Sequence, residues 1–180
     1  MSFTIRPARM DDVPMLMELI GRSARGLSKD DYRAEQVEGA LRGAFGVDSQ
    51  LLRDQTFFVV EESGVCVACG GWSYRSTLFG SDARSGRDAS VLDPKTQAAK
   101  IRAFFVDPLH ARRGIGTLLL EHCEQQALLH GYREVELMAT LPGARLYAAR
   151  GYTRGEPVAY DVGQGENIEF LPMRKRLVAP

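Results

Sequence analysis

The sequence predicts a mixed α/β (α+β) fold in a single domain. Short stretches with the two-residue alternation of strands are interspersed along the chain with stretches whose apolar residues recur every three or four positions, as in helices. The 180 residues suffice for one hydrophobic core, and no change in composition marks a linker. We therefore expect residues 1–180 to form one domain.

The composition indicates a soluble globular protein. Hydrophobic residues make up 44% and charged residues 26%, and 23 basic side chains balance 23 acidic ones. Nucleic-acid binding depends on an excess of cationic groups, so a net charge of zero argues against a nucleic-acid partner. No apolar run reaches the roughly 20 residues of a membrane-spanning helix, and no hydrophobic signal segment opens the chain. We expect a cytoplasmic protein with no membrane partner.

The first third of the chain predicts one strand and two helices. Phe3–Arg6 alternates as a strand, Asp11 is placed to cap the first helix, and Ser28 with Asp31 is placed to cap the second. Pro14 falls in the first turn of the first helix, where a missing N–H costs little. The expected apolar faces are Val13, Leu16, Met17 and Ile20 for the first helix, and Val37, Ala40, Leu41 and Ala44 for the second.

A hairpin and a long polar segment follow. Thr56–Glu62 and Val65–Trp72 are strand-like, and Ser63–Gly64 between them is a two-residue turn signal. Residues 74–97 have little periodicity, and loops of this length inside a compact domain are often functional. This segment is either a flap on the substrate side or a plain insertion.

The three cysteines are expected to be buried free thiols. Cys66 and Cys69 lie three apart on the predicted strand, so their side chains point to opposite faces, too far apart for a disulfide. Together with Cys123 they make an odd number, and no second ligand pair accompanies them. We expect no metal site.

The last half of the chain alternates strands and helices. The predicted order is a strand at Ile101–Val106, a helix from Ile115 to near Gly131, a strand at Glu134–Ala139, a short helix ending at Gly151, and a strand at Ile168–Leu177. Pro172 cannot donate a ladder hydrogen bond. The final strand should therefore be bulged there or have an edge facing solvent.

The start of the predicted helix at Ile115 has the character of an anion site. The first turn of a helix leaves backbone N–H groups unpaired at the positive end of its dipole. Gly114 and Gly116 allow an anion to approach the main chain, and Arg112 and Arg113 can add charge. A Walker loop is excluded because no Gly-Lys-Ser or Gly-Lys-Thr occurs, and Leu119 replaces the third glycine of a dinucleotide fingerprint.

This segment resembles the acetyl-CoA-binding motif of the GCN5-related N-acetyltransferase (GNAT) family. That motif runs from a strand through Arg/Gln-X-X-Gly-X-Gly/Ala into a helix. Gly114-Ile115-Gly116 match its glycines, and Val106 lies eight residues before Gly114, as in the family. Ala111 replaces the family's Arg or Gln. The alternative for this stretch alone is an ordinary strand–loop–helix with incidental glycines.

A second segment, Gly143–Tyr152, resembles the next motif of the family. Its features are a hydrophobic-Tyr pair and a following Gly-aromatic step. The resemblance implies that Tyr147 is catalytic and donates a proton to the departing CoA thiolate. The alternative is that Tyr147 only packs against the preceding strand. Thr140 stands where the family often has Asn, and its hydroxyl could still bind the cosubstrate.

The resemblance also implies a fold and a binding mode for acetyl-CoA. The fold is a central, mostly antiparallel sheet flanked by helices, in which the strand ending at Val106 and the strand ending near Ala139 splay apart. Backbone groups of Phe105 and Val106 would pair with the pantetheine arm, and a backbone N–H near Val106 could polarise the thioester carbonyl. The implied cofactor-binding residues are Phe105, Val106, Ala111, Arg112, Arg113, Gly114, Ile115, Gly116, Thr117 and Thr140.

The base and the acceptor are less well defined. Lys100 occupies the position of a glutamate base found in some members, with Arg102 beside it, and neither is a plausible base. Asp107, His110 or a water chain are the candidates. Trp72, Tyr74, Arg75 and the segment after them are expected on the acceptor side, where an apolar, cationic rim would suit an aromatic or carboxylate-bearing substrate.

The function implied by both motifs is an acetyl-CoA-dependent N-acetyltransferase. The acceptor would be a primary amine of a small molecule or a peptide, and many relatives pair as homodimers. Because no base is identified, a non-catalytic acyl-CoA-binding or sensing domain is the main alternative. An interaction protein with a relict pocket is the third.

Overall fold

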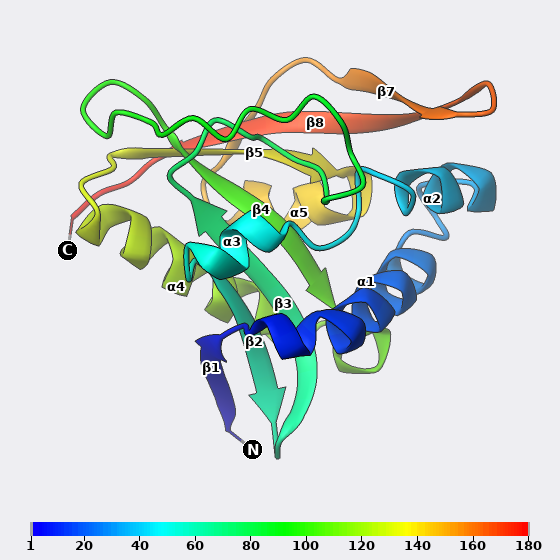
Figure 1. The fold of residues 1–180 in the computed structure, drawn as a ribbon, viewed down its shortest axis with the longest axis horizontal. Helices are drawn as coiled ribbons and strands as arrows, with labels where there is room; N and C mark the ends of the chain where they lie inside the picture. Colours follow the sequence, from blue (N-terminus) through cyan, green and yellow to red (C-terminus); the bar gives the residue numbers. More distant parts are fainter. Residues whose placement is uncertain (1, 180) are drawn as a thin grey trace.

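Eight strands form one sheet in the computed structural model, which describes residues 2–179 (Figure 1). The order across the sheet is β1-β2-β3-β4-β5-β8-β6, and β7 also pairs with β8. All neighbours are antiparallel except β4 and β5. The strands are β1 Phe3–Pro7, β2 Phe57–Glu62, β3 Val65–Ser73, β4 Ala99–Val106, β5 Glu134–Thr140, β6 Thr153–Arg154, β7 Val158–Gly163 and β8 Glu166–Arg176.

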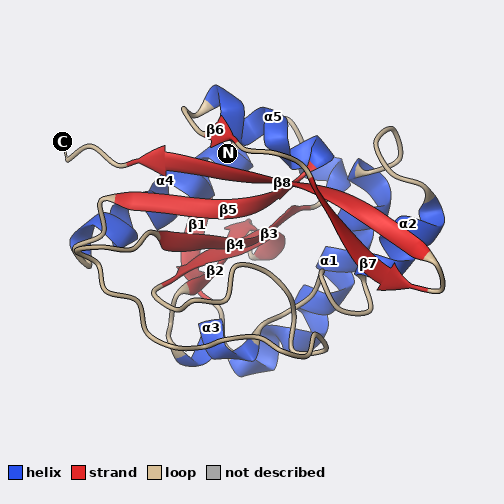
Figure 2. Cartoon of the chain, turned by 90° about the horizontal axis from the view of Figure 1, so that it is seen from above, coloured by secondary structure: helices blue, strands red, loops and turns tan. Residues whose placement is uncertain are grey.

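Helices cover both faces of this sheet and create two cores. Figure 2 shows α4 and α5 on one side, and α1 and α3 on the other. Leu119, Leu120 and Cys123 of α4 fill the first core, and Leu16, Leu19 and Ile20 of α1 fill the second. The helices are α1 Val13–Leu27, α2 Ala34–Ala40, α3 Ser49–Arg53, α4 Ile115–Leu129 and α5 Leu141–Ala149. The predicted mixed α/β fold with a mostly antiparallel sheet is confirmed.

The N-terminal helices differ from the prediction at their starts. A 3-10 turn at Met10–Asp12 precedes α1, and Asp12 binds Arg6 at 2.8 Å instead of capping the helix. Met17 is 46% exposed, so the prediction that it lies on the buried face of α1 is wrong. Leu19 lies on that face instead. The caps expected at Asp11 and Ser28 are wrong, because the N-cap positions of α1 and α2 are Asp12 and Arg33. For α2, the Gln36 side chain accepts from the Arg33 N–H at 2.8 Å.

The elements missing from the prediction are short or irregular. Helix α3 has five residues, too few for a periodic pattern, and depends on Asp48, whose carboxylate accepts from the Gln50 N–H at 3.0 Å. Strands β6 and β7 are exposed edge pieces. The 74–97 segment contains no helix or named strand, but Arg75 and Val91 form an isolated bridge.

Pro172 lies at an interruption in the strands beside β8. Strand β8 pairs with β5 in unbroken register through Pro172 and Met138, so there is no bulge at this point. On the other side, pairing with β7 ends at Phe170 and pairing with β6 begins at Met173. Pro172 therefore lies at a position of β8 where neither β6 nor β7 is paired with it. Of the two predictions, a bulge or an edge facing solvent, the structure has the open edge.

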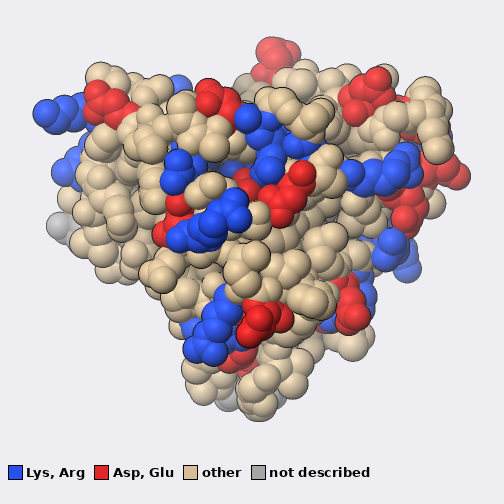
Figure 3. Space-filling model, viewed as in Figure 1, with Lys and Arg blue, Asp and Glu red and all other residues tan. Residues whose placement is uncertain are grey.

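The cysteines lie in the interior, and charged side chains of both signs share the surface. All three cysteines are free and buried, as predicted, and burial raises the pKa of Cys66 to about 11. The expectation that Cys66 and Cys69 point to opposite faces is wrong, because a bulge at Val67 of β3 places both in the second core. Acidic and basic side chains are interspersed on the face drawn in Figure 3. Within residues 2–179, no helix is long and apolar enough to cross a bilayer, and no group of three or more His, Cys, Asp or Glu side chains is placed to hold a metal ion.

Candidate active site

The parallel pair β4 and β5 separates after two positions. Ala99 pairs with Val135 and Lys100 with Glu136, and beyond them the strands diverge. A bulge in β4 contributes to this: Arg102 and Phe105 face Gly71 and Cys69 of β3, and Ala103 between them has a φ of 56°. The splay between the strands that end at Val106 and Thr140 is therefore present.

A cavity of about 80 Å³ lies in this splay. Its walls come from both diverging strands, from α5, and from three segments distant in sequence. The lining residues are Ala44, Phe45, Gly46, Phe79, Gly80, Ile101, Arg102, Ala103, Phe104, Phe105, Leu137, Met138, Thr140, Gly143, Tyr147 and Phe170. Tyr147 and Thr140 are thus brought together with β4, as the sequence implied.

The backbone of β4 alternates between β3 and the splay. The Asp107 N–H donates to the Val67 carbonyl at 2.8 Å, so Phe105, two residues earlier, also directs its backbone groups to β3. Val106 faces away from β3, and its N–H donates to Ser23 Oγ of α1 at 3.1 Å. The expectation that the Phe105 backbone faces the splay is therefore wrong. Phe105 contributes to the cavity lining, and Val106 offers its backbone.

Unpaired backbone donors gather where β4 leads into α4. Asp107 shapes the loop by accepting from the Leu109 N–H at 2.9 Å, and Arg112 and Gly114 adopt positive φ angles of 65° and 80°. Among the described residues, no acceptor pairs with any backbone N–H from Arg112 to Thr117. This row of donors at the positive end of a 15-residue helix suits a diphosphate.

The two arginines beside this row are used differently. The Arg113 guanidinium binds Glu62 of β2 at 2.7 and 2.9 Å and lies 5.2 Å from the ring of Phe3. Its hydrogen bonds hold the pKa of Glu62 below the ordinary value. The predicted free charge at Arg113 is therefore already paired. Arg112 is exposed and has no ion pair within residues 2–179.

Tyr147 has the setting of a hydroxyl that stays protonated. Its ring packs 6.3 Å from Phe104 and 5.6 Å from Tyr152, and it is 7% exposed. Burial raises its pKa above the ordinary value, which keeps the hydroxyl protonated at neutral pH. Within the described chain its hydroxyl makes no hydrogen bond, so the proton is uncommitted. Packing and proton donation are thus compatible at this position.

Thr140 ends β5 and caps α5. Its Oγ1 accepts from the Gly143 N–H at 3.1 Å, which fixes the start of the helix that holds Tyr147. The hydroxyl hydrogen remains available to a ligand in the cavity.

The sequence matches the Acetyltransferase (GNAT) family over residues 17–152, three quarters of the chain. The chain belongs to this family. The GNAT resemblance and the acetyltransferase class predicted from the two motifs are confirmed. No curated protein is similar enough in sequence to count as a relative.

Solved GNAT structures share the fold across the whole chain. A GCN5-related N-acetyltransferase from Rhodopseudomonas palustris is 20% identical, with a TM-score of 0.72 over 98% of this chain and 97% of that one. The PaiA N-acetyltransferase of Thermoplasma acidophilum, solved with coenzyme A, is 16% identical, with a TM-score of 0.67 over 98% and 100%. YncA of Salmonella typhimurium, solved with its cofactor acetyl-CoA, is 19% identical, with a TM-score of 0.61 over 100% and 99%.

The base candidates of this GNAT chain lie outside the cavity. Asp107 binds Arg22 at 3.0 Å; burial raises its pKa, but the Leu109 N–H and Arg22 outweigh burial and the pKa is lowered. His110 lies 3.6 Å from both Glu62 and Asp107. Neither side chain lines the cavity. Lys100, at the glutamate position of some members, forms an ion pair with Glu136.

Trp72 and Arg75, which were expected on the acceptor side, do not line the cavity. Trp72 is 1% exposed and packs in the core against Tyr132, and Arg75 binds Asp54 at 2.7 Å. Of the 74–97 segment, Phe79 and Gly80 reach the cavity. Buried Arg102 holds them there by donating to the carbonyls of Thr77 at 3.2 Å and Gly80 at 2.8 Å. Phe45 and Phe170, also missed, have no local sequence signal because separate segments bring them together.

Proposed function

We propose that residues 1–180 act as one N-acetyltransferase domain that uses acetyl-CoA to acetylate a primary amine of a small molecule or a peptide. The observation that carries the proposal is the row of free backbone N–H groups from Arg112 to Thr117, directly beside the splay of β4 and β5. Family membership and the cavity that contains Tyr147 support it.

The residues present fit acetyl-CoA. The free N–H groups at the start of α4 would bind the diphosphate, with Arg112 adding charge at the surface. Gly116 leaves room for close packing, because a Cβ there would lie 3.0 Å from Leu146 of α5. Along the splay, the Val106 N–H would exchange Ser23 Oγ for a carbonyl of the pantetheine arm. The Thr140 hydroxyl would donate from the opposite wall.

The thioester supplies an acetyl group bound to a good leaving group. As the amine nitrogen bonds to the acyl carbon, the carbon–sulfur bond breaks and its electron pair goes to sulfur. The Tyr147 hydroxyl would give its proton to that sulfur. The proton lost by the amine nitrogen would then restore Tyr147 through solvent, so the products are an amide and a thiol.

A binding or sensing domain is the second candidate. The observation that favours it is that, within residues 2–179, none of the cavity-lining side chains is a carboxylate or a histidine that could serve as base. Direct attack by an amine that arrives neutral removes this requirement, which keeps the enzyme as the first candidate.

Acetyl-CoA is expected to stabilise the chain in a thermal unfolding experiment. At 100 times the dissociation constant, binding to the native state contributes about 2.7 kcal/mol, or roughly 5–10 °C in Tm for a chain of this length. Dephospho-CoA, which keeps the diphosphate and lacks the 3′-phosphate, should give much of the same shift. An unchanged Tm at high ligand excess would exclude both candidate functions, the acetyltransferase and the sensing domain.

A further inference from the structure

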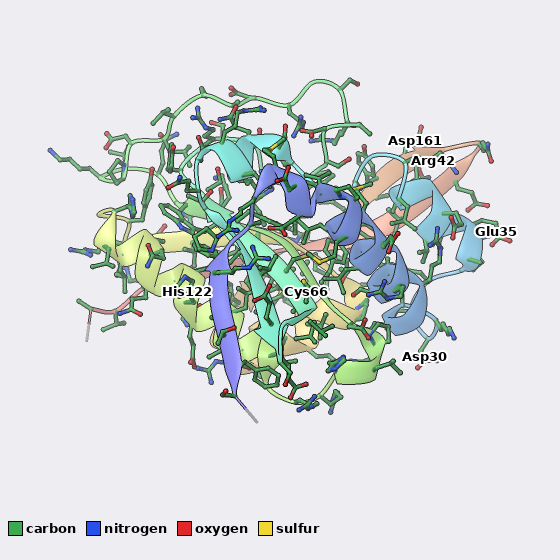
Figure 4. All side chains as sticks on the ribbon, turned by 60° about the horizontal axis from the view of Figure 1, so that its bottom comes forward. Asp30, Glu35, Arg42, Cys66, His122 and Asp161 are labelled. Atoms are coloured by element: carbon green, nitrogen blue, oxygen red, sulfur yellow. The ribbon has the colours of Figure 1, made fainter. Side chains whose placement is uncertain are left out.

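The acceptor side of the cavity is walled by aromatic rings from distant segments. Phe45 contacts Phe105 and Phe170 with ring centroids 5.7 and 6.0 Å apart, and Phe79 contacts Tyr160 and Phe170 at 5.1 and 5.7 Å. These rings come from the segment between α2 and α3, from residues 74–97, and from β4, β7 and β8. Arg42 links the segment between α2 and α3 to β7, because its guanidinium donates to the Val162 carbonyl at 3.2 Å (Figure 4).

Arg84, which does not itself line the cavity, packs on the rings of this wall beside Gly80 of the cavity lining. The Arg84 guanidinium is 4.2 Å from the centroid of Phe79 and 5.6 Å from that of Tyr160, and it donates to the Phe79 carbonyl at 3.0 Å. Its side chain packs over Gly80, where a Cβ would come within 2.5 Å of it. Within residues 2–179 Arg84 forms no ion pair, whereas its neighbour Arg87 binds both Asp48 and Asp82.

The cavity provides no acidic partner for a positively charged group on the acceptor. Among the described residues no aspartate or glutamate lines it, and the one charged lining residue, Arg102, is paired with Asp48 at 3.1 Å. A polyamine or a lysine-rich peptide would lose hydration on entry without gaining a carboxylate partner. Such surroundings also favour the neutral form of an amine, which is the form that attacks.

We infer that the acceptor is a small amine with an apolar or aromatic body and a carboxylate, the body packing against the aromatic wall and the carboxylate binding Arg84. This inference rests on the proposed acetyl transfer. It assigns Arg84 as a specificity-determining residue, since its planar guanidinium can bind a carboxylate through two hydrogen bonds.

A matched set of amines tests this inference in the full-length chain. L-phenylalanine and 2-phenylethylamine differ only by the carboxylate, and spermidine represents a polycation. We expect kcat/KM for phenylalanine to exceed that for each of the others at least tenfold. Arg84→Gln should abolish the advantage of phenylalanine over 2-phenylethylamine. The control Arg53→Gln, an exposed arginine of α3 that contacts Gln50, should preserve the advantage.

The outcomes separate this inference from the proposed function. Equal or better use of 2-phenylethylamine or spermidine overturns the carboxylate-bearing acceptor and supports acetyl transfer. An advantage that survives Arg84→Gln overturns the role of Arg84. If acetyl-CoA binds but none of the three amines is acetylated, the inferred acceptor class is overturned. If acetyl-CoA does not bind, the proposed function is overturned as well.

Discussion

Replacing Tyr147 with phenylalanine is expected to lower kcat about 100-fold and to leave the affinity for acetyl-CoA within about twofold. Proton donation by a positioned side chain contributes about 10²–10⁴-fold to a rate. The Tyr147 hydroxyl makes no hydrogen bond within the described chain, and the ring packing would survive in phenylalanine. The substitution therefore removes the proton-donating hydroxyl and leaves the packing of the fold intact. Steady-state thiol release and calorimetric titration with acetyl-CoA measure the two quantities.

Tyr152→Phe is the matched control for this substitution. Tyr152 packs against Tyr147, and its hydroxyl donates to Glu124 at 2.8 Å, but it does not line the cavity. Glu124 keeps its hydrogen bonds from Lys175, so the control should fold and turn over within about twofold of the unmodified chain. Unchanged kcat in Tyr147→Phe would show that Tyr147 only packs.

The second large effect is expected at Gly114. Its φ of 80° is strained for a β-branched residue, while no atom lies within 4 Å of a Cβ placed there. Gly114→Val therefore acts through the backbone and should misalign the N–H groups that face the diphosphate. Losing one charge-assisted hydrogen bond costs roughly 2 kcal/mol, so we expect acetyl-CoA affinity to fall about 30-fold, measured by calorimetry.

Gly114→Asn separates backbone conformation from the loss of glycine itself. Asparagine has a side chain of similar size and tolerates positive φ. We expect its acetyl-CoA affinity to stay within about threefold of the unmodified chain. Wild-type affinity in Gly114→Val, or equal losses in both variants, would contradict the role given to the conformation at Gly114.

The parts of the site that could be predicted from sequence are local in the chain. Gly114 and Gly116 follow a strand and open an amphipathic helix, so one continuous segment contains both the donors and the turn that presents them. Tyr147 was found in the same way, by its neighbours in sequence. The strand spacing failed for Cys66 and Cys69, which were expected on opposite faces and lie on the same one, because the bulge at Val67 has no local sequence signal.

The remainder depends on contacts between distant residues. Glu62, which occupies the Arg113 guanidinium, lies 51 positions away, and Ser23, which binds the Val106 N–H, lies 83 positions away. The direction of the Phe105 backbone depends on the bulge at Ala103, which has no composition signal. Trp72 and Arg75 do not line the cavity, and their sequence pattern could not show this because a hydrophobic or charged residue near a hairpin suits a core or a rim equally well.

The central claim is tested most directly by thiol release from acetyl-CoA, recorded with and without a panel of primary amines while the amine products are weighed by mass spectrometry. Sustained release that requires an amine, with one acetylated amine formed for each thiol, is the predicted result. Binding of acetyl-CoA with no amine-dependent release would contradict acetyl transfer and assign the chain to acyl-CoA binding alone.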